Sequence, residues 1–86
     1  MSGITETQKA RLKWRCRRGM LELDILLARF CDKAIEQINP KELEVIEQLL
    51  ETPDPELLAW LMGDEKPTHQ EFAYVVRWIQ SFLDTQ

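Results

Sequence analysis

The apolar positions of this chain recur every three or four residues, which is the period of one face of an α-helix. The clearest run lies between residues 20 and 38, where one continuous apolar stripe is formed by Met20, Leu23, Leu27, Phe30, Ala34 and Ile38. We find no segment that alternates between apolar and polar residues as a half-buried strand does. The pattern therefore predicts an all-α protein, and we expect a compact five-helix bundle that forms a single domain over residues 1–86.

Caps, prolines and glycines divide the apolar pattern into segments. Thr5 and Gln8 form a T-x-x-Q capping box at the start of the first segment. Gly19 is placed to end this segment in the left-handed conformation that glycine accepts. Ala10 and Trp14 share one face of it. The predicted helices cover about residues 5–17, 20–38, 40–51, 55–62 and 69–83.

The three C-terminal helices have capping residues of their own. Residues 39–42 (NPKE) supply an N-cap, a proline at the first helical position and a glutamate at the third. Asp54 is the expected N-cap of the fourth helix, and Gly63 is expected to stop it. Thr68 and Glu71 form a second capping box ahead of the fifth helix.

The charge of the chain is divided unevenly. Residues 1–18 carry six basic residues and one acidic residue, a balance of +5, whereas residues 19–86 carry five basic and fourteen acidic residues, a balance of −9. A basic segment can bind nucleic acid, but the acidic remainder would repel phosphate, so we expect no nucleic-acid partner. No apolar run reaches the roughly 18–20 residues of a transmembrane segment, and no secretory signal precedes the domain, so we expect a cytoplasmic protein.

The residues that carry chemistry are few. Cys16 and Cys31 lie 15 residues apart without a CxxC pair, and His69 is the single histidine. A zinc site needs about four ligands, so we expect no metal. Two reduced, partly buried thiols are the simplest interpretation, and a disulfide or a reactive thiol stays open. No nucleophile–base spacing and no phosphate-binding glycine motif is present, so we do not expect an enzyme.

The stretch RCRRGMLELD, residues 15–24, combines basic residues, a glycine and the start of the second apolar stripe. On a helical wheel with about 100° per residue, Glu22 faces away from that stripe. Ile25, an apolar residue, lies beside it and also faces outward. Asp24 falls at the edge of the stripe, where it would be half-buried.

Two interpretations of this stretch remain open on physical grounds. In the first, Gly19 is only a turn, Arg17 and Arg18 are solvated, and Glu22 favours the positive end of the second helix. In the second, Gly19 lets the backbone of another protein come close. Arg18 and Glu22 would then offer opposite charges on either side of the glycine, as directional contacts at an interface.

The segment from Arg18 to Glu22 is an RGxxE motif, and with it the sequence resembles the succinate dehydrogenase assembly factor family, the flavinylation factors of bacteria and mitochondria. The resemblance covers roughly residues 8–80. It also includes Trp14, Cys16, Leu26, Leu27, Phe30, Leu49, Leu50, Glu51, Asp54, Leu57, Trp60, Leu61, Gly63 and Pro67.

The resemblance implies a five-helix chaperone that is not itself an enzyme and binds no cofactor tightly. Its client would be the flavoprotein subunit of succinate dehydrogenase, and in bacteria the client could extend to fumarate reductase. The factor would promote covalent attachment of FAD to a histidine of that subunit. Some bacterial relatives carry an older label as antitoxin of a small inner-membrane toxin, which is the alternative function.

The resemblance also implies which residues bind the partner, and we expect this of Arg17, Arg18, Gly19, Glu22 and Asp24. For Asp24 a hydrogen bond to Trp14 or to the backbone is an equal alternative. We expect Arg18→Ala and Glu22→Ala to weaken client binding without unfolding the bundle, and we expect a monomer.

Overall fold

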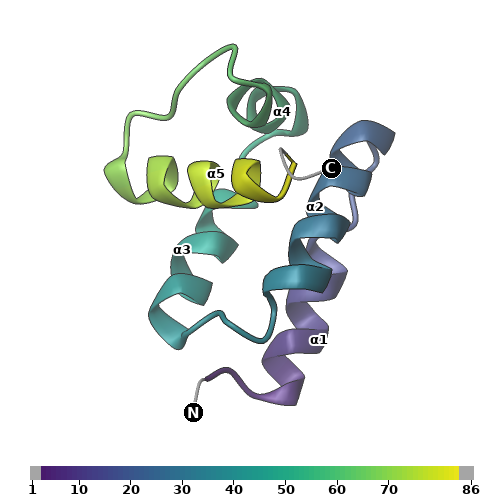
Figure 1. Cartoon of the computed structure of the whole chain (residues 1–86). Coiled ribbons are helices and arrows are strands. Elements are labelled where there is room, and N and C mark those ends of the chain that lie inside the picture. The colour runs from purple at the N-terminus through teal and green to yellow at the C-terminus, as the bar shows by residue number, and fades with distance from the viewer. Residues whose placement is uncertain (1–2, 84–86) are drawn as a thin grey trace.

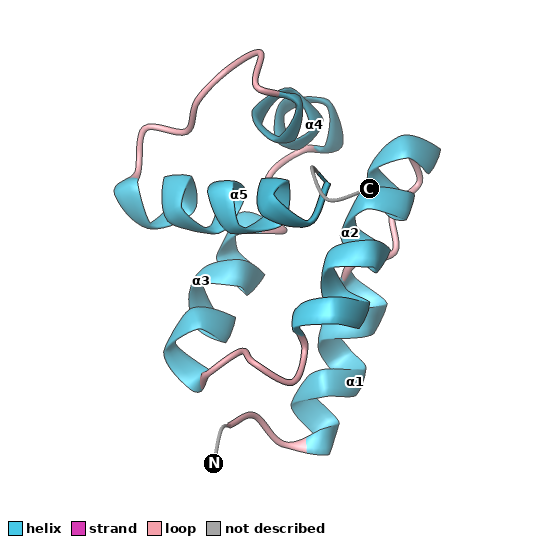
Figure 2. Ribbon diagram, in the orientation of Figure 1, coloured by secondary structure: helices cyan, strands magenta, loops and turns pink. Residues whose placement is uncertain are grey.

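The five predicted helices are present in the computed structural model, which describes residues 3–83 (Figure 1). They are α1 (Glu6–Arg15), α2 (Leu21–Ala34), α3 (Pro40–Leu49), α4 (Asp54–Met62) and α5 (Gln70–Leu83). No strand occurs within residues 3–83, as Figure 2 shows by its colours. The all-α prediction is therefore confirmed.

The helices are arranged around α5. Helices α1 and α2 run side by side in opposite directions, and α3 follows on the other side of the molecule (Figure 1). Helix α5 lies across this layer and packs against α2, α3 and α4. The turn between α1 and α2 lies at the end of the hairpin away from the N-terminus, on the side where α4 begins.

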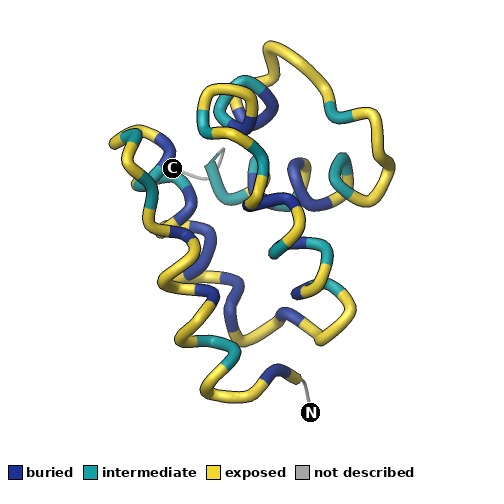
Figure 3. Tube along the Cα trace, turned by 180° about the vertical axis from the view of Figure 1, so that it is seen from behind, coloured by how far each residue is buried: buried dark blue, intermediate teal, exposed yellow. Residues whose placement is uncertain are grey.

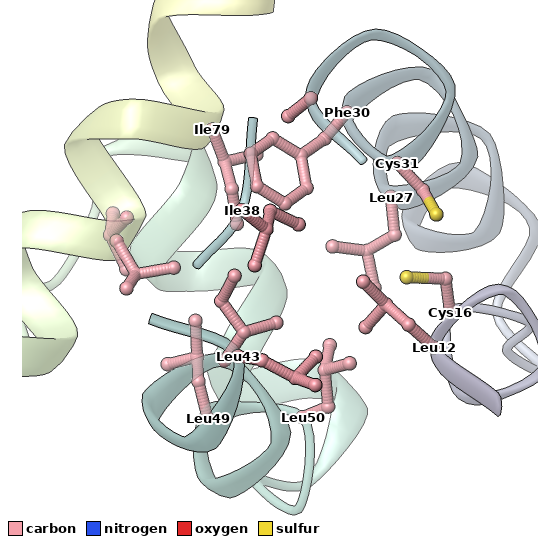
Figure 4. Close-up of a cluster of buried hydrophobic side chains, with 14 of the residues drawn as sticks. Leu12, Cys16, Leu27, Phe30, Cys31, Ile38, Leu43, Leu49, Leu50 and Ile79 are labelled. Carbon is pink, nitrogen blue, oxygen red and sulfur yellow. The ribbon is translucent and has the colours of Figure 1, made fainter. Parts of the chain in front are cut away.

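The core confirms the apolar stripe predicted for the second helix. Leu23, Leu27, Phe30, Ala34 and Ile38 are all buried, and Met20 packs against them while partly exposed. Figure 4 shows this core in close-up, with Phe30 at its centre. The Phe30 ring makes edge contacts with Trp78 and Phe82 of α5, at centroid distances of 5.3 and 5.7 Å. These aromatic contacts fasten α5 to α2.

The first helix starts as predicted and ends differently. The capping box of Thr5 and Gln8 is present. The helix stops at Arg15 with Cys16 as its C-cap, two residues before the predicted end. Gly19 does not have a positive φ, so the prediction that it ends the helix in the left-handed conformation is wrong. Cys16 makes the cap in an ordinary right-handed conformation and donates its backbone N–H to the Leu12 carbonyl, while the Arg17 N–H donates to the Trp14 carbonyl.

The face shared by Ala10 and Trp14 lies on the outer side of α1. Ala10 is exposed and Trp14 is 72% exposed, whereas Leu12 is fully buried. A residue two positions from Leu12 lies about 200° around the helix, so burying Leu12 turns both of the others outward. Trp14 is thus a surface residue.

The second helix starts one residue later than predicted and ends four residues earlier, at Ala34. Asn39 precedes Pro40 and is extended, with φ −94° and ψ 168°, because a residue before proline disfavours the helical region. The chain leaves the helix over a turn ahead of this point, while Ile38 remains buried. Asn39 then caps α3 in a capping box with Glu42, as predicted.

Two of the predicted caps in the second half are wrong. Pro53 occupies the N-cap position of α4, and Asp54 is the first helical residue, because its carboxylate binds Arg18 instead of the helix backbone. Gly63 ends α4 with φ 84°, as predicted. Helix α5 starts at Gln70, and the His69 carbonyl accepts the first helical bond, so Thr68 lies one residue too early to be its N-cap.

Candidate partner-binding site at the first helix junction

Arg18 is held by internal contacts from three segments of the chain. Its Nη2 lies 2.9 Å from Asp54 Oδ1 and donates to the Leu50 carbonyl at 2.8 Å. Its Nε donates to Asp54 Oδ1 at 3.0 Å, and its Nη1 donates to the Arg15 carbonyl at 3.1 Å. The side chain is only 14% exposed. Arg18 therefore ties the α1–α2 junction to the α3–α4 junction through a planar fork of donors, which lysine cannot reproduce.

Asp24 closes the same turn from the other side. Its Oδ1 accepts the backbone N–H of Arg18 at 2.9 Å, and the residue is half-buried, as the helical wheel predicts. The structure thus shows the backbone hydrogen bond that was one of the alternatives for Asp24. Because both the side chain and the N–H of Arg18 are bound, the turn has a defined conformation.

An exposed surface surrounds this anchored turn, and we call it the junction face. It consists of Trp14, Arg17, Gly19, Leu21, Glu22 and Ile25. Three of its members are large apolar side chains exposed to solvent, at 72% exposure for Trp14, 70% for Leu21 and 48% for Ile25. Exposed residues line the outer side of the α1–α2 hairpin in Figure 3.

Gly19 leaves the junction face sterically open. A Cβ atom built on it would have no heavy atom of the described chain within 4 Å, beyond its two neighbours in sequence. The glycine is therefore not required by packing inside this chain. Its missing side chain leaves room for a surface that approaches from outside.

The structure separates the predicted site residues into two groups. Arg18 and Asp24 contact each other and the body of the protein, whereas Arg17, Gly19 and Glu22 are exposed. The interpretation in which Arg18 is solvated is wrong, because its side chain is only 14% exposed and pairs with Asp54. The hydrophobic and charge pattern near residue 18 gave no sign of this partner. Sequence reasoning did not include the exposed Trp14 among the partner-binding residues, although its basic neighbours Lys13 and Arg15 indicate that this segment faces water.

A basic hollow adjoins the junction face. It has a volume of about 550 Å³ and is lined by Arg11, Trp14, Arg15, Arg17, Arg18 and Leu50. Arg11 pairs with Glu47 at 3.3 Å and Arg18 pairs with Asp54. Among the described contacts of residues 3–83, Arg15 and Arg17 have no ion pair. The hollow therefore combines an exposed indole with two free guanidinium groups, the residue types most often found at the centres of protein interfaces.

Two other features are absent from the part of the chain that the structure describes. Within residues 3–83, no three His, Cys, Asp or Glu side chains gather closely enough to hold a metal ion. None of the helices in that part of the chain has the length and apolar character needed to cross a membrane.

Comparison with known proteins identifies the family of the chain. The chain matches the family model described as "Flavinator of succinate dehydrogenase" over residues 10–83, which include all five helices in whole or in part. The chain belongs to this flavinator family. The resemblance carried by the RGxxE motif is therefore confirmed.

Several curated relatives in the flavinator family are similar along most of their length. The chain is 47% identical to the FAD assembly factor SdhE of Coxiella burnetii over 70 residues, which cover 81% of this chain and 85% of the relative. It is 50% identical to the FAD assembly factor SdhE of Colwellia psychrerythraea, covering 74% of this chain and 70% of the relative. The SdhE of Legionella pneumophila strain Paris is 45% identical, with 86% and 92% covered.

Proposed function

We propose that this protein is an assembly factor that binds the flavoprotein subunit of succinate dehydrogenase and promotes covalent attachment of FAD to it. The proposal rests on membership of the flavinator family and on relatives named FAD assembly factor. The observation in the structure that carries it is the junction face, where an open glycine lies among exposed apolar residues on a turn held by Arg18.

The residues of the RGxxE motif have different roles. Arg18 is a positioning residue, since its guanidinium is used inside the protein. Gly19 admits the client's backbone, and Glu22 offers an exposed carboxylate that has no partner among the contacts of the described chain. Leu21 and Ile25 supply apolar area beside them. A preorganised turn of this kind binds at low entropic cost.

The proposed role asks for no bond-making step by this chain and no tightly bound cofactor. FAD belongs to the client, and the client's own groups form the bond. The factor favours the client conformation that holds the flavin beside its histidine, because it binds that conformation more tightly than the other. A difference of about 1.4 kcal/mol in affinity changes the ratio of the two conformations tenfold. Fumarate reductase is a second client of the same chemical type.

The decisive experiment measures covalent flavin on the client. The gene for this protein is deleted from its host, and the succinate dehydrogenase flavoprotein is run on a denaturing gel and read by flavin fluorescence. We expect the signal to fall in the deletion strain and to return with the wild-type protein. Unchanged fluorescence in the deletion strain would contradict the proposed function.

Two variants test the junction face within that experiment. Glu22→Ala removes the exposed carboxylate, and Gly19→Arg places a long side chain where the client would approach. We expect both to fold like the wild type and to restore less than a tenth of the covalent flavin. Glu44→Ala, at an exposed glutamate of α3, is the matched control and should restore it fully. Full restoration by Gly19→Arg would show that the client docks elsewhere.

A further inference from the structure

The two cysteines face each other between α1 and α2. Cys16 forms the C-cap of α1, and Cys31 lies in the third turn of α2. Both are free and buried, at 3% and 2% exposure. Figure 4 shows both sulfur atoms pointing into the space between the two helices, toward one another. The two side chains are joined by a hydrogen bond.

A small hollow gives access to this pair from the surface. It has a volume of about 290 Å³, and both cysteines line it together with Lys13, Arg17, Asp24 and Asp32. A water molecule occupies roughly 30 Å³ in the liquid, so the hollow has room for a small polar oxidant of a few heavy atoms. The charged rim keeps the entrance hydrated. The thiols are thus buried on the protein side and approachable from one direction.

The two sulfur atoms differ in acidity. The pKa of Cys16 is raised, first by its hydrogen bond with Cys31 and then by burial. The pKa of Cys31 is lowered, chiefly because the Cys16 thiol donates to its sulfur, and Lys13 adds a favourable charge, while burial and Asp32 oppose the shift. The thiolate is the reactive form of cysteine, and Lys13 on the rim of the hollow favours it at Cys31, so we assign the first attack to Cys31 and the second to Cys16.

We propose that Cys16 and Cys31 are a modification site at which a peroxide forms a reversible disulfide between α1 and α2. The Cys31 thiolate attacks one peroxide oxygen and breaks the O–O bond, and the released hydroxide takes up a proton to leave as water. The resulting sulfenic acid is attacked by the Cys16 sulfur, which breaks the S–O bond and expels the second water with the Cys16 proton. The two thiols lose two electrons, and the peroxide is reduced to two waters.

This inference goes beyond the assembly role and does not depend on it. A buried cysteine pair can also be ordinary core packing, in which case oxidation would stop at single modified sulfur atoms or not occur in the folded protein. The two possibilities differ in what a peroxide does to the native chain. They are separated by counting thiols and by measuring mass.

The test treats the purified full chain with hydrogen peroxide under native conditions, quenches it in acid, and alkylates it in denaturant before intact-mass analysis. For the wild type we expect a monomer that has lost two hydrogen atoms and both alkylation sites, and dithiothreitol should restore both. Cys16→Ser should instead gain oxygen atoms or form a disulfide-linked dimer. A wild type that keeps both alkylatable thiols, or that gains oxygen as the serine variant does, would overturn the proposal.

A second measurement does not rely on the serine variants being folded. The oxidised and reduced forms of the wild type are compared by thermal unfolding. A disulfide closing a loop of this length should raise the melting temperature by roughly 12–24 °C, and dithiothreitol should reverse the rise. An unchanged or lower melting temperature after loss of both thiols would show that the bond does not fit the native hairpin and would overturn the proposal as well.

Discussion

Replacing Arg18 by alanine should destabilise the protein strongly, although the residue lies in a surface turn. The change removes a guanidinium that contacts Asp54, the Leu50 carbonyl and the Arg15 carbonyl. It leaves the Asp54 carboxylate and the buried end of α3 without their donor. The contacts of Arg18 therefore lead to a different prediction from the sequence alone, which led us to expect that Arg18→Ala would leave the bundle intact.

The size of the effect follows from the contacts. Hydrogen bonds to charged groups contribute about 1.5–3 kcal/mol each. The side chains of Arg18 and Asp54 are 14% and 26% exposed, so solvent screens the ion pair and it belongs at the lower end of that range. Together with the 2.8 Å bond to Leu50, the loss is about 3 kcal/mol. That is a large share of the roughly 4–13 kcal/mol that a chain of this size has in total.

The assay is urea unfolding followed by circular dichroism, supported by thermal melts. We expect a lower urea midpoint with an unchanged slope, because the surface exposed on unfolding stays the same. In the melt, about 3 kcal/mol corresponds to a fall of roughly 12–24 °C for a domain of this size. Arg17→Ala is the matched control, since Arg17 is the adjacent exposed arginine and should change stability by less than about 0.5 kcal/mol.

Arg18→Lys provides an internal check on the geometry. A lysine keeps the positive charge but lacks the planar, forked set of donors of a guanidinium group, so it should recover less than half of the lost stability. The reasoning is refuted if Arg18→Ala and Arg17→Ala melt within about 2 °C of each other. It is also refuted if Arg18→Lys is as stable as the wild type, because then only the charge matters.

Substitutions at four further positions test other parts of the fold by the same melts. Asp24→Ala removes the acceptor of the Arg18 N–H and should cost about 1–2 kcal/mol, whereas Asp24→Asn keeps an oxygen there and should cost less; equal losses would contradict this. Gly63→Ala should cost about 1 kcal/mol because of the φ of 84°, while Gly19→Ala, in open space without positive φ, should be nearly neutral. Phe30→Ala should cost about 3–5 kcal/mol through loss of the contacts to α5, and a smaller loss would show that the core collapses around the gap.

The local pattern of the sequence was sufficient for the helices but not for their ends. The stripe from Leu23 to Ile38 and the boxes at Thr5 and Asn39 depend on neighbours three or four residues away, so they can be read along the chain. The end of α2 depends on where the chain must turn to reach α3, which no capping residue marks. Helix ends of this kind are decided by tertiary packing.

In the candidate site, too, local features could be predicted from the sequence and long-range contacts could not. The outward orientation of Glu22 and Ile25 follows from helical geometry and was predicted correctly. The role of Arg18 could not be predicted, because its partner Asp54 is 36 residues away in sequence and looked like an ordinary helix cap. The exposure of Trp14 was not predicted, because only the burial of Leu12 shows which way the face of Ala10 and Trp14 points.

The contacts of Arg18 also determine when the turn between α1 and α2 can fold during synthesis of the chain. The partners of its side chain at Leu50 and Asp54 follow 32 and 36 residues later. Ribosomes add about 5–20 residues per second, so a nascent chain spends seconds with α1 and α2 made and the guanidinium unbound. The turn takes its final shape only when the start of α4 has emerged and folded back. A client that recognises this turn would therefore engage finished molecules and pass over incomplete ones.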